Sequence, residues 1–307
     1  MRDRCVELLA PAITSSSKPV IVDATLGLGG HTEALLTRFE NLIVIGIDRD
    51  KSALEKASVR LAPFGDRLKT AHCVFDEITE VVQSFGFTRI NGALFDLGVS
   101  SMQLDESERG FSYSQDAPLD MRMDRSKGIT AYEIVNSYEP GKLVKILRTY
   151  GEEKFATRIV ENIVKARAIA PLNSTTELAT LVKESIPAAT RRTGGNPAKR
   201  TFQALRIEAN DELGAITRAL PQALDLLMVQ GRLVVMSFQS LEDRIVKEIF
   251  QEASTSKSPR NLPIELPEYA AKFSLVFRSG ETPSQSELDE NPRSASVRLR
   301  AIERVAA

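Results

Sequence analysis

Apolar, β-branched runs that alternate with amphipathic helical stretches constrain the fold of residues 19–98 more than any other feature. The runs at 19–24, 42–48 and 92–96 read as strands, and the stretches at 32–38 and 52–61 carry apolar side chains at helical spacing. Continuous apolar strands separated by helices are typical of a parallel sheet that is covered on both faces. The sequence therefore predicts a doubly wound α/β sheet.

The pattern changes after about residue 104, where helical segments follow one another without a convincing buried strand. The predicted helices are 142–150, 152–169, 174–185 and 201–220, and strands return at 231–238, 273–277 and 295–300. We expect one α/β domain, residues 1–104 and 209–307, that is interrupted after its fourth strand by an all-helical insertion, residues 105–208.

Composition excludes several classes of protein. The chain has 307 residues, of which 42% are hydrophobic, so it can bury a core. Lys and Arg total 40 against 41 for Asp and Glu, which argues against nucleic-acid binding by bulk charge but allows a local basic patch. Two cysteines and two histidines cannot build a disulfide framework or a four-ligand zinc cluster, so no metal is expected. No apolar run reaches the ~20 residues of a membrane helix, and residues 1–10 do not resemble a signal peptide, so we expect a cytoplasmic protein without membrane contact.

A glycine-rich segment, residues 23–32, follows the first predicted strand and opens a helix. Glycines there let the backbone pass close to a ligand, and the helix N-terminus offers free N–H groups. A dinucleotide fingerprint would place its third glycine at position 32, where this chain has Thr32, and this disfavours NAD. A tight strand–helix connection without a ligand is the alternative.

Three aspartates, Asp23, Asp48 and Asp96, end predicted strands and would form an acidic rim. Asp48 lies 18 residues beyond Gly30, where a carboxylate can accept hydrogen bonds from both hydroxyls of a ribose. Such a rim repels a pyrophosphate and favours a sulfonium that carries an amino group. S-adenosylmethionine (SAM) therefore fits better than NAD. A single aspartate at a strand end is more often a helix cap or a solvated turn residue.

Nine short strings occur in one order along both the predicted sheet and the insertion. They are GGHT at 29–32, IDRD at 47–50, LGVSS at 97–101, QLD at 103–105, ERGFS at 108–112, PLDMRMD at 118–124, YGEE at 150–153, RTFQALRI at 200–207 and SLEDR at 240–244. With them the chain resembles the ribosomal RNA small-subunit methyltransferase H family, also called MraW, from end to end.

The resemblance implies SAM-dependent methylation of the N4 amine of a cytidine in the decoding region of 16S rRNA, with the small ribosomal subunit as partner. It also implies a Rossmann-like methyltransferase sheet with an inserted all-helical substrate-recognition domain. Phe75 could cover one face of the adenine, although without the resemblance it reads as a core side chain. The family's cofactor contacts fall on Gly29, Gly30, His31, Asp48, Phe75, Asp96 and Gln103.

Three features depart from the family pattern. The family usually opens with a His-x-Pro-Val-Leu segment, which this chain lacks before Met1, so we expect a shortened start. Met102 replaces a common proline beside Gln103. Gln239 replaces a histidine, and we interpret it as a hydrogen-bonding substitute. In the helix that follows, Ser240 with Asp243 is the expected cap.

The cytosine amine is a poor nucleophile, because its lone pair is delocalised into the ring. A hydrogen-bond acceptor beside the amine would favour pyramidalisation, so positioning does most of the work. The candidate acceptors are Asp96 and the backbone carbonyls of residues 97–99. A splayed-out base also needs a stacking platform, for which Phe111 or Tyr113 is the candidate. An ordered loop that packs on the insertion is the alternative.

Residues 185–207 contain five basic side chains and no acidic one, which favours contact with a phosphate backbone. A solvated basic loop is the alternative. A second basic cluster, Arg293, Arg298, Arg300 and Arg304, lies near the end of the chain. The five candidates for RNA binding are Arg191, Arg192, Lys199, Arg200 and Arg206.

Other functions stay open at this point. The chain could be a SAM-dependent methyltransferase for another nucleic acid or a protein, or a catalytically impaired RNA-binding assembly factor. An NAD-dependent oxidoreductase is a distant third. No sequence feature defines an oligomeric state, and we expect the folded subunit, rather than naked rRNA, to present the target.

Overall fold

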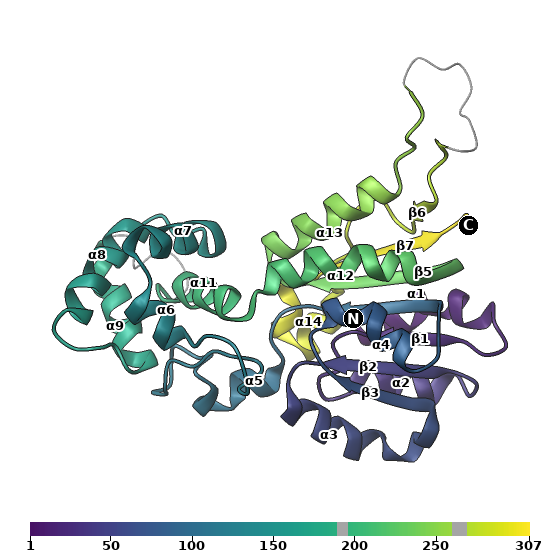
Figure 1. Cartoon of the computed structure of the whole chain (residues 1–307), viewed down its shortest axis with the longest axis horizontal. Helices are drawn as coiled ribbons and strands as arrows, with labels where there is room; N and C mark the ends of the chain where they lie inside the picture. The colour runs from purple at the N-terminus through teal and green to yellow at the C-terminus, as the bar shows by residue number, and fades with distance from the viewer. Residues whose placement is uncertain (189–195, 260–268) are drawn as a thin grey trace. The chain divides into compact units, whose positions relative to one another are not determined.

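The computed structural model describes residues 1–188, 196–259 and 269–307. The chain forms two compact units (Figure 1). Residues 1–98 and 213–307 make up the first, which we call the sheet unit, and residues 99–212 make up the second, which we call the helical unit.

A seven-stranded sheet with the order β3-β2-β1-β4-β5-β7-β6 forms the sheet unit. The first five strands in that order run parallel, whereas β7 runs antiparallel to both of its neighbours. This confirms the predicted doubly wound α/β sheet. The strands are β1 Val20–Asp23, β2 Ile43–Asp48, β3 Leu68–His72, β4 Ile90–Asp96, β5 Leu227–Ser237, β6 Phe273–Leu275 and β7 Arg298–Arg304.

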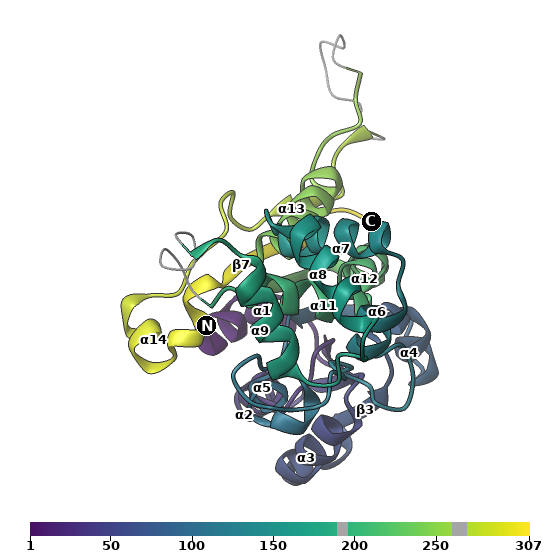
Figure 2. The ribbon, with the colours of Figure 1, turned by 90° about the vertical axis from the view of Figure 1, so that its left-hand side faces the viewer.

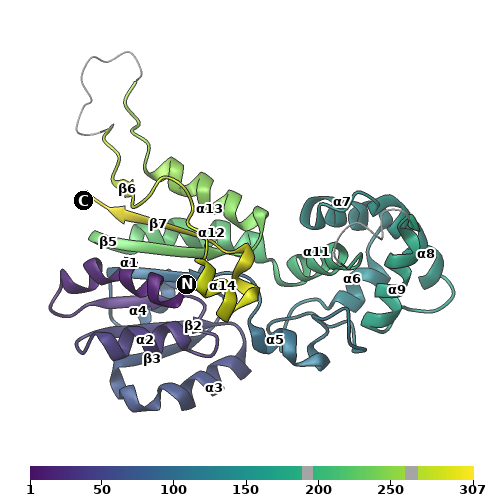
Figure 3. The same ribbon diagram turned by 180° about the vertical axis from the view of Figure 1, so that it is seen from behind.

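Helices cover both faces of this sheet, as the uninterrupted apolar strands require. Within β1, Val20 and Val22 face one cluster and Ile21 faces another, because side chains alternate along a strand. The first cluster is closed by α4 (Ile78–Ser84), α12 (Glu212–Leu226) and α13 (Ser240–Ala253). The opposite face is closed by α1 (Arg2–Thr14) and α2 (Gly30–Arg38). Figure 3 shows these two helices with the chain turned by 180° from the view of Figure 1. The remaining helices of this unit are α3 (Lys51–Leu61) and α14 (Gln285–Glu290).

The helical unit buries a core of its own. Its helices are drawn in Figure 2. Helices α7 and α11 pack closely, because a Cβ on Gly151 would lie 2.6 Å from the carbonyl oxygen of Arg200. Within the described residues, its helices are α5 (Ser101–Asp105), α6 (Ala131–Ser137), α7 (Pro140–Gly151), α8 (Ala156–Arg167), α9 (Thr175–Ser185) and α11 (Lys199–Asn210).

The predicted single helix over residues 201–220 is wrong at Asp211, which adopts a left-handed conformation with φ 48°. Helix α11 ends at Asn210, whose side chain accepts a hydrogen bond from the Met123 amide and donates one to the Met121 carbonyl. These long-range bonds fix the chain where the helical periodicity alone would continue. A new helix, α12, then begins at Glu212.

The described residues contain neither a membrane-spanning helix nor a cluster of metal-ligating side chains. In these parts of the chain no helix is long and apolar enough to cross a membrane. The same residues contain no group of three or more His, Cys, Asp or Glu side chains placed to hold a metal ion.

Candidate functional site

The glycine-rich loop after β1 is held by the carboxylate at the end of β2. The amide of Gly27 donates to Oδ2 of Asp48 at 2.7 Å, and the amide of Asp50 donates to Oδ1 at 2.8 Å. Burial raises the pKa of Asp48, and these backbone hydrogen bonds oppose that rise. Asp48 therefore fixes two loops at the carboxyl edge of the sheet while each oxygen keeps a further lone pair for a ligand.

Two glycines of this loop serve different purposes. Gly29 caps α2 in a left-handed conformation with φ 79°, and a Cβ there would lie 2.7 Å from Cδ1 of Leu61. Position 29 thus requires a glycine for two reasons: the backbone is left-handed there, and a side chain would collide with α3. A Cβ on Gly30 would meet no atom within 4 Å. The loop therefore leaves space for a ligand at Gly30.

Asp23 does not contribute to an exposed acidic rim, which corrects the expectation from sequence. Its side chain is 1% exposed, and its Oδ2 accepts a hydrogen bond from the Thr32 hydroxyl at 2.7 Å. Burial raises the pKa of Asp23 to about 6. The residue that disfavoured a dinucleotide, Thr32, thus joins the end of β1 to the first turn of α2.

Asp96 ends β4 and carries the least satisfied carboxylate of this edge. Its amide donates to the Thr25 hydroxyl, and its Oδ2 lies 3.8 Å from Nδ1 of His31. The Oδ1 atom is buried without a hydrogen-bond partner among the described residues, although the side chain as a whole is 31% exposed. Burial, with the negative charges of Asp23 and Glu242 nearby, raises the pKa of Asp96 to about 7.

His31, in the first turn of α2, is uncharged at neutral pH. Burial lowers the pKa of its imidazole to about 4. Its Nε2 is also buried without a partner in the described parts of the chain. The contact between His31 and Asp96 therefore joins a neutral ring to a titrating carboxyl group and is not an ion pair. A ligand with both donors and acceptors would satisfy the two orphaned atoms.

Phe75 lies just beyond β3, in the 3-10 turn η2 (Phe75–Glu77). The edge of its half-buried ring meets Phe95, with centroids 5.5 Å apart and planes at 79°. Asp76 anchors the turn to α12, because its carboxylate accepts from Nε of Arg218 at 2.8 Å and its carbonyl accepts from the amide group of Gln222. The turn thus holds Phe75 at the same carboxyl edge as Asp48.

The loop after β5 is organised by Glu242, which sequence reasoning treated only as part of a helix start. Its Oε2 accepts from the amides of Phe238 and Gln239, at 2.8 Å and 3.0 Å, and the residue is 1% exposed. The helix is capped from Gln239, so the expected cap at Ser240 is wrong. Asp243 instead forms a bidentate ion pair with Arg300 of β7, at 2.7 Å and 3.0 Å.

Gln103 belongs to the helical unit. Its side-chain oxygen accepts from the amide of Ser100 at 3.1 Å, and the Ser100 hydroxyl accepts from the amide of Gln103 at 3.2 Å. This capping box defines the start of α5. Contact between Gln103 and a cofactor stays a prediction.

The two candidate stacking rings, Phe111 and Tyr113, are engaged in packing within the helical unit. Phe111 is 7% exposed and lies in the core, with the guanidinium of Arg109 over its ring at 5.8 Å from the centroid. Tyr113 is half-buried and meets Phe202 edge to face at 5.8 Å. Stacking of a base on either ring stays a prediction.

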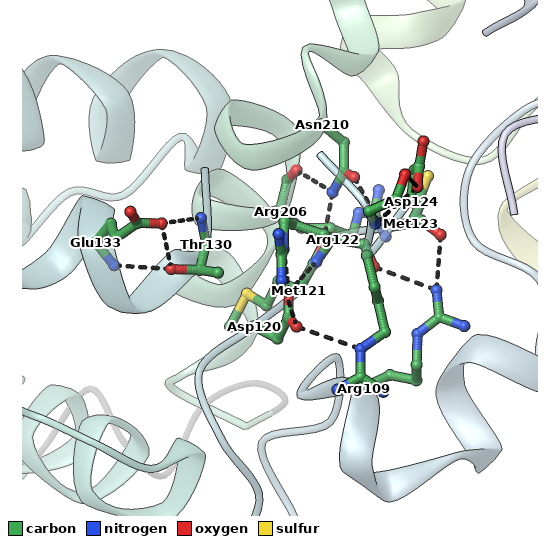
Figure 4. A network of polar contacts seen from close by, with 12 residues as sticks. Arg109, Asp120, Met121, Arg122, Met123, Asp124, Thr130, Glu133, Arg206 and Asn210 are labelled. Atoms are coloured by element: carbon green, nitrogen blue, oxygen red, sulfur yellow. Dashed lines mark hydrogen bonds and ion pairs between the residues drawn. The ribbon is translucent and has the colours of Figure 1, made fainter. Parts of the chain in front are cut away.

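The PLDMRMD string forms a polar network within the helical unit (Figure 4). Asp120 binds Nε of Arg122 at 2.7 Å, and Nη2 of Arg109 donates to the Met123 carbonyl at 2.8 Å. Met121 is fully buried in a left-handed conformation with φ 60°. Such strain persists only where the surroundings over-determine the backbone, as this network does.

The five RNA-binding candidates have different surroundings. Arg191 and Arg192 lie outside the described residues. Lys199 and Arg200 are exposed in the first turn of α11, where Arg200 also donates to the Glu152 carbonyl. Arg206 is 14% exposed and pairs bidentately with Glu212 at 2.8 Å and 2.9 Å. The structure thus places Arg206 in an internal ion pair and not on an exposed basic surface.

Comparison with known proteins gave consistent results along the whole chain. The model of the MraW methylase family matches residues 1–305. The ribosomal RNA small subunit methyltransferase H of Renibacterium salmoninarum is 56% identical over 309 residues, which cover 99% of this chain and 93% of that protein. The protein of the same name from Mycolicibacterium smegmatis is 56% identical over 307 residues (99% and 82%). The one from Streptomyces avermitilis is 52% identical over 305 residues (99% and 96%).

Proposed function

Because the chain belongs to the MraW methylase family, we propose that it transfers a methyl group from SAM to the N4 amine of a cytidine in the decoding region of 16S rRNA. The observation that carries this proposal is the carboxyl edge of the sheet, where Asp96 and His31 present buried polar atoms without partners among the described residues. When bound, SAM supplies a methyl group that is electrophilic because it is attached to a sulfonium.

The residues present at this edge fit SAM. Asp48 has lone pairs left for ribose hydroxyls, and Gly30 leaves room beside the start of α2. His31 and Asp96 offer the orphaned atoms that a ligand with an amino and a carboxylate group would satisfy. Phe75, held by its turn, is the side chain that would cover the adenine. No metal is needed for this chemistry, since the acceptor only has to be positioned.

Asp96 is the acceptor that would orient the cytosine amine. An ionised Asp96 can accept a hydrogen bond from the amine, which favours a pyramidal nitrogen with an available lone pair. It can then take the proton that the methylated amine releases. Because the pKa of Asp96 is about 7, the ionised fraction, and with it turnover, rises as pH increases through 7. The backbone carbonyls of residues 97–99 are the other candidate acceptors at this turn.

We assign methyl transfer to the sheet unit and recognition of the rRNA to the helical unit. Lys199 and Arg200 are exposed cations of the helical unit that can contact phosphates. The chain as a whole is nearly neutral, with a net charge of -1, so bulk attraction to RNA is weak. A folded small subunit in the cytoplasm, which presents its target in a fixed shape, is therefore the expected substrate.

The test is methyl transfer to small ribosomal subunits that lack the modification. The purified chain is incubated with labelled SAM and these subunits, and the digested RNA is analysed by mass spectrometry. We expect N4-methylcytidine from the wild-type chain and at least a 100-fold lower rate from Asp96→Asn, a loss typical of an oriented catalytic group. The exposed Asp66→Asn variant is the matched control and should keep the wild-type rate.

The possible outcomes separate the alternatives. A different methylated nucleoside would replace the proposed substrate with another one. SAM binding without any methylated product would instead identify a catalytically impaired assembly factor. Methylation of naked 16S rRNA at the same rate as the subunit would contradict the requirement for a folded particle.

A further inference from the structure

A cavity of the sheet unit lies between α13 and the β6–β7 pair, and no residue of the glycine-rich loop lines it. Its volume is about 270 Å³. Four apolar side chains, three cations and one amide line it. The apolar residues are Phe250, Leu275, Phe277 and Ala301, and the polar ones are Lys247, Gln251, Arg278 and Arg300.

The charge of this cavity is unbalanced. Arg300 is neutralised by its bidentate pair with Asp243. Lys247 and Arg278 are both exposed, and neither forms an ion pair with a residue in the described parts of the chain. Among the described residues, no acidic side chain lines the cavity. Two unpaired cations next to a half-buried aromatic ring, Phe277, match a ligand that combines negative charge with a flat apolar group.

The strand register places one lining residue of this cavity, Arg300, near the reactive edge of the sheet. Asp96 of β4 is paired with Met236 of β5, and the preceding residue, Val235, is paired with Arg300 of β7. Arg300 is therefore almost level with Asp96 along the strands. Adjacent strands are about 4.8 Å apart, so the two-strand step from β4 to β7 amounts to roughly 10 Å. A single strand of RNA spans that distance in a few nucleotides.

We propose that this cavity binds a nucleotide of the substrate rRNA that flanks the methylated cytidine, with its phosphate at Lys247 and Arg278 and its base against Phe277. This inference rests on the proposed function and adds a substrate contact that the sheet unit itself provides. Asp243 has a positioning role, because its pair with Arg300 holds α13 against β7 and so fixes one wall of the cavity.

The experiment measures RNA affinity apart from catalysis. A short, fluorescently labelled single-stranded RNA is titrated with the full chain at several salt concentrations, and binding is followed by anisotropy. The variants are the double change Lys247→Gln/Arg278→Gln and the single change Phe277→Leu. The control is Lys18→Gln, which removes an exposed lysine just before β1, at the opposite edge of the sheet. Circular dichroism establishes that each variant is folded.

We expect the double variant to bind RNA about tenfold more weakly and to lower the slope of log affinity against log salt by about 0.7, since the two cations hold one phosphate and each phosphate neutralised on a single strand contributes about 0.7. Phe277→Leu should also weaken binding about tenfold, because a base–aromatic stack is lost, but should leave the slope unchanged. With small subunits as substrate, both variants should raise KM more than they lower kcat. Lys18→Gln should match the wild type in every measurement.

Wild-type affinity and slope in the double variant would overturn the proposal. If that variant bound RNA normally but methylated subunits slowly, the cavity would contact a ribosomal protein, and the assignment to RNA would be wrong. SAM affinity, measured by calorimetry, should be unchanged in all variants. A wild-type chain that produces no N4-methylcytidine would refute the proposed function, whereas the RNA titration would still test the cavity by itself.

Discussion

Replacing Asp96 by asparagine should stabilise the protein at high pH while it lowers turnover at least 100-fold. The pKa of Asp96 rises to about 7 in the folded chain, from about 3.9 for an aspartate in an unfolded chain. Ionising this carboxyl therefore opposes folding, and a difference of three pH units corresponds to about 4 kcal/mol. Solvent screening of a side chain that is 31% exposed lowers this to about 2 kcal/mol.

The sign of the effect depends on pH. Below about pH 4 the carboxyl is protonated in both the folded and the unfolded chain, so Asp96 carries no penalty and asparagine changes little. As pH rises from 4 to 7, the wild-type chain loses stability, because the unfolded chain releases its proton and is favoured by doing so while the folded chain still retains its own. Above pH 7 the full penalty applies. At pH 8 the variant should therefore unfold about 5 °C higher, at a few degrees per kcal/mol for a unit of this size.

Circular dichroism is the suitable assay, because the chain contains no tryptophan to report unfolding by fluorescence. Melting curves of the wild type, Asp96→Asn and the control Asp66→Asn are recorded between pH 4 and pH 8 without SAM. Asp66 is exposed, so its replacement should leave the pH dependence unchanged. An Asp96→Asn variant that melts at or below the wild-type temperature at pH 8 would refute this account of the carboxylate.

Three further changes test the parts that position this edge and the helical unit. Asp48→Ala should weaken SAM binding at least tenfold in calorimetry, because it removes both a ribose acceptor and the tether of Gly27; wild-type affinity would contradict this. Glu212→Gln removes the buried negative charge that pairs with the guanidinium of Arg206. The free energy of unfolding, measured by denaturant titration, should fall by about 3 kcal/mol. Equal denaturation midpoints for the variant and the wild type would contradict this. Asn91→Ala removes side-chain bonds to backbone groups of α1 and β1 and should cost about 2 kcal/mol by the same measurement.

Much of the sheet unit follows from local pattern. Apolar runs mark the strands, and the residue types at their ends place Asp48 and Asp96 at one edge, because parallel strands end on the same side of a sheet. The same logic could not distinguish Asp23 from the other two. The carboxylate of Asp23 accepts a hydrogen bond from the hydroxyl of Thr32, nine residues later in the chain. Only the fold brings these two oxygen atoms to 2.7 Å from each other.

Candidate residues in the helical unit were harder to interpret from the sequence. A sequence does not show whether a basic or aromatic side chain is exposed to a ligand or is already paired or packed within the protein. Arg206 is paired with Glu212, and Phe111 lies in the core. Phe202, the partner of Tyr113, is far from it along the chain. Sequence spacing does not encode such partners, so the roles assigned to these rings stay predictions.

The sequence by itself determined the alternation of strands and helices, the family, and the chemistry available at the carboxyl edge. These depend on periodicity and on residue type at fixed positions, which are local properties. Tertiary structure alone decided which charged side chains pair with one another inside the protein and where α11 ends. It also decided that the pKa of Asp96 lies near 7. Burial and long-range pairing set those outcomes, because the cost of desolvating a carboxylate depends on every element packed around it.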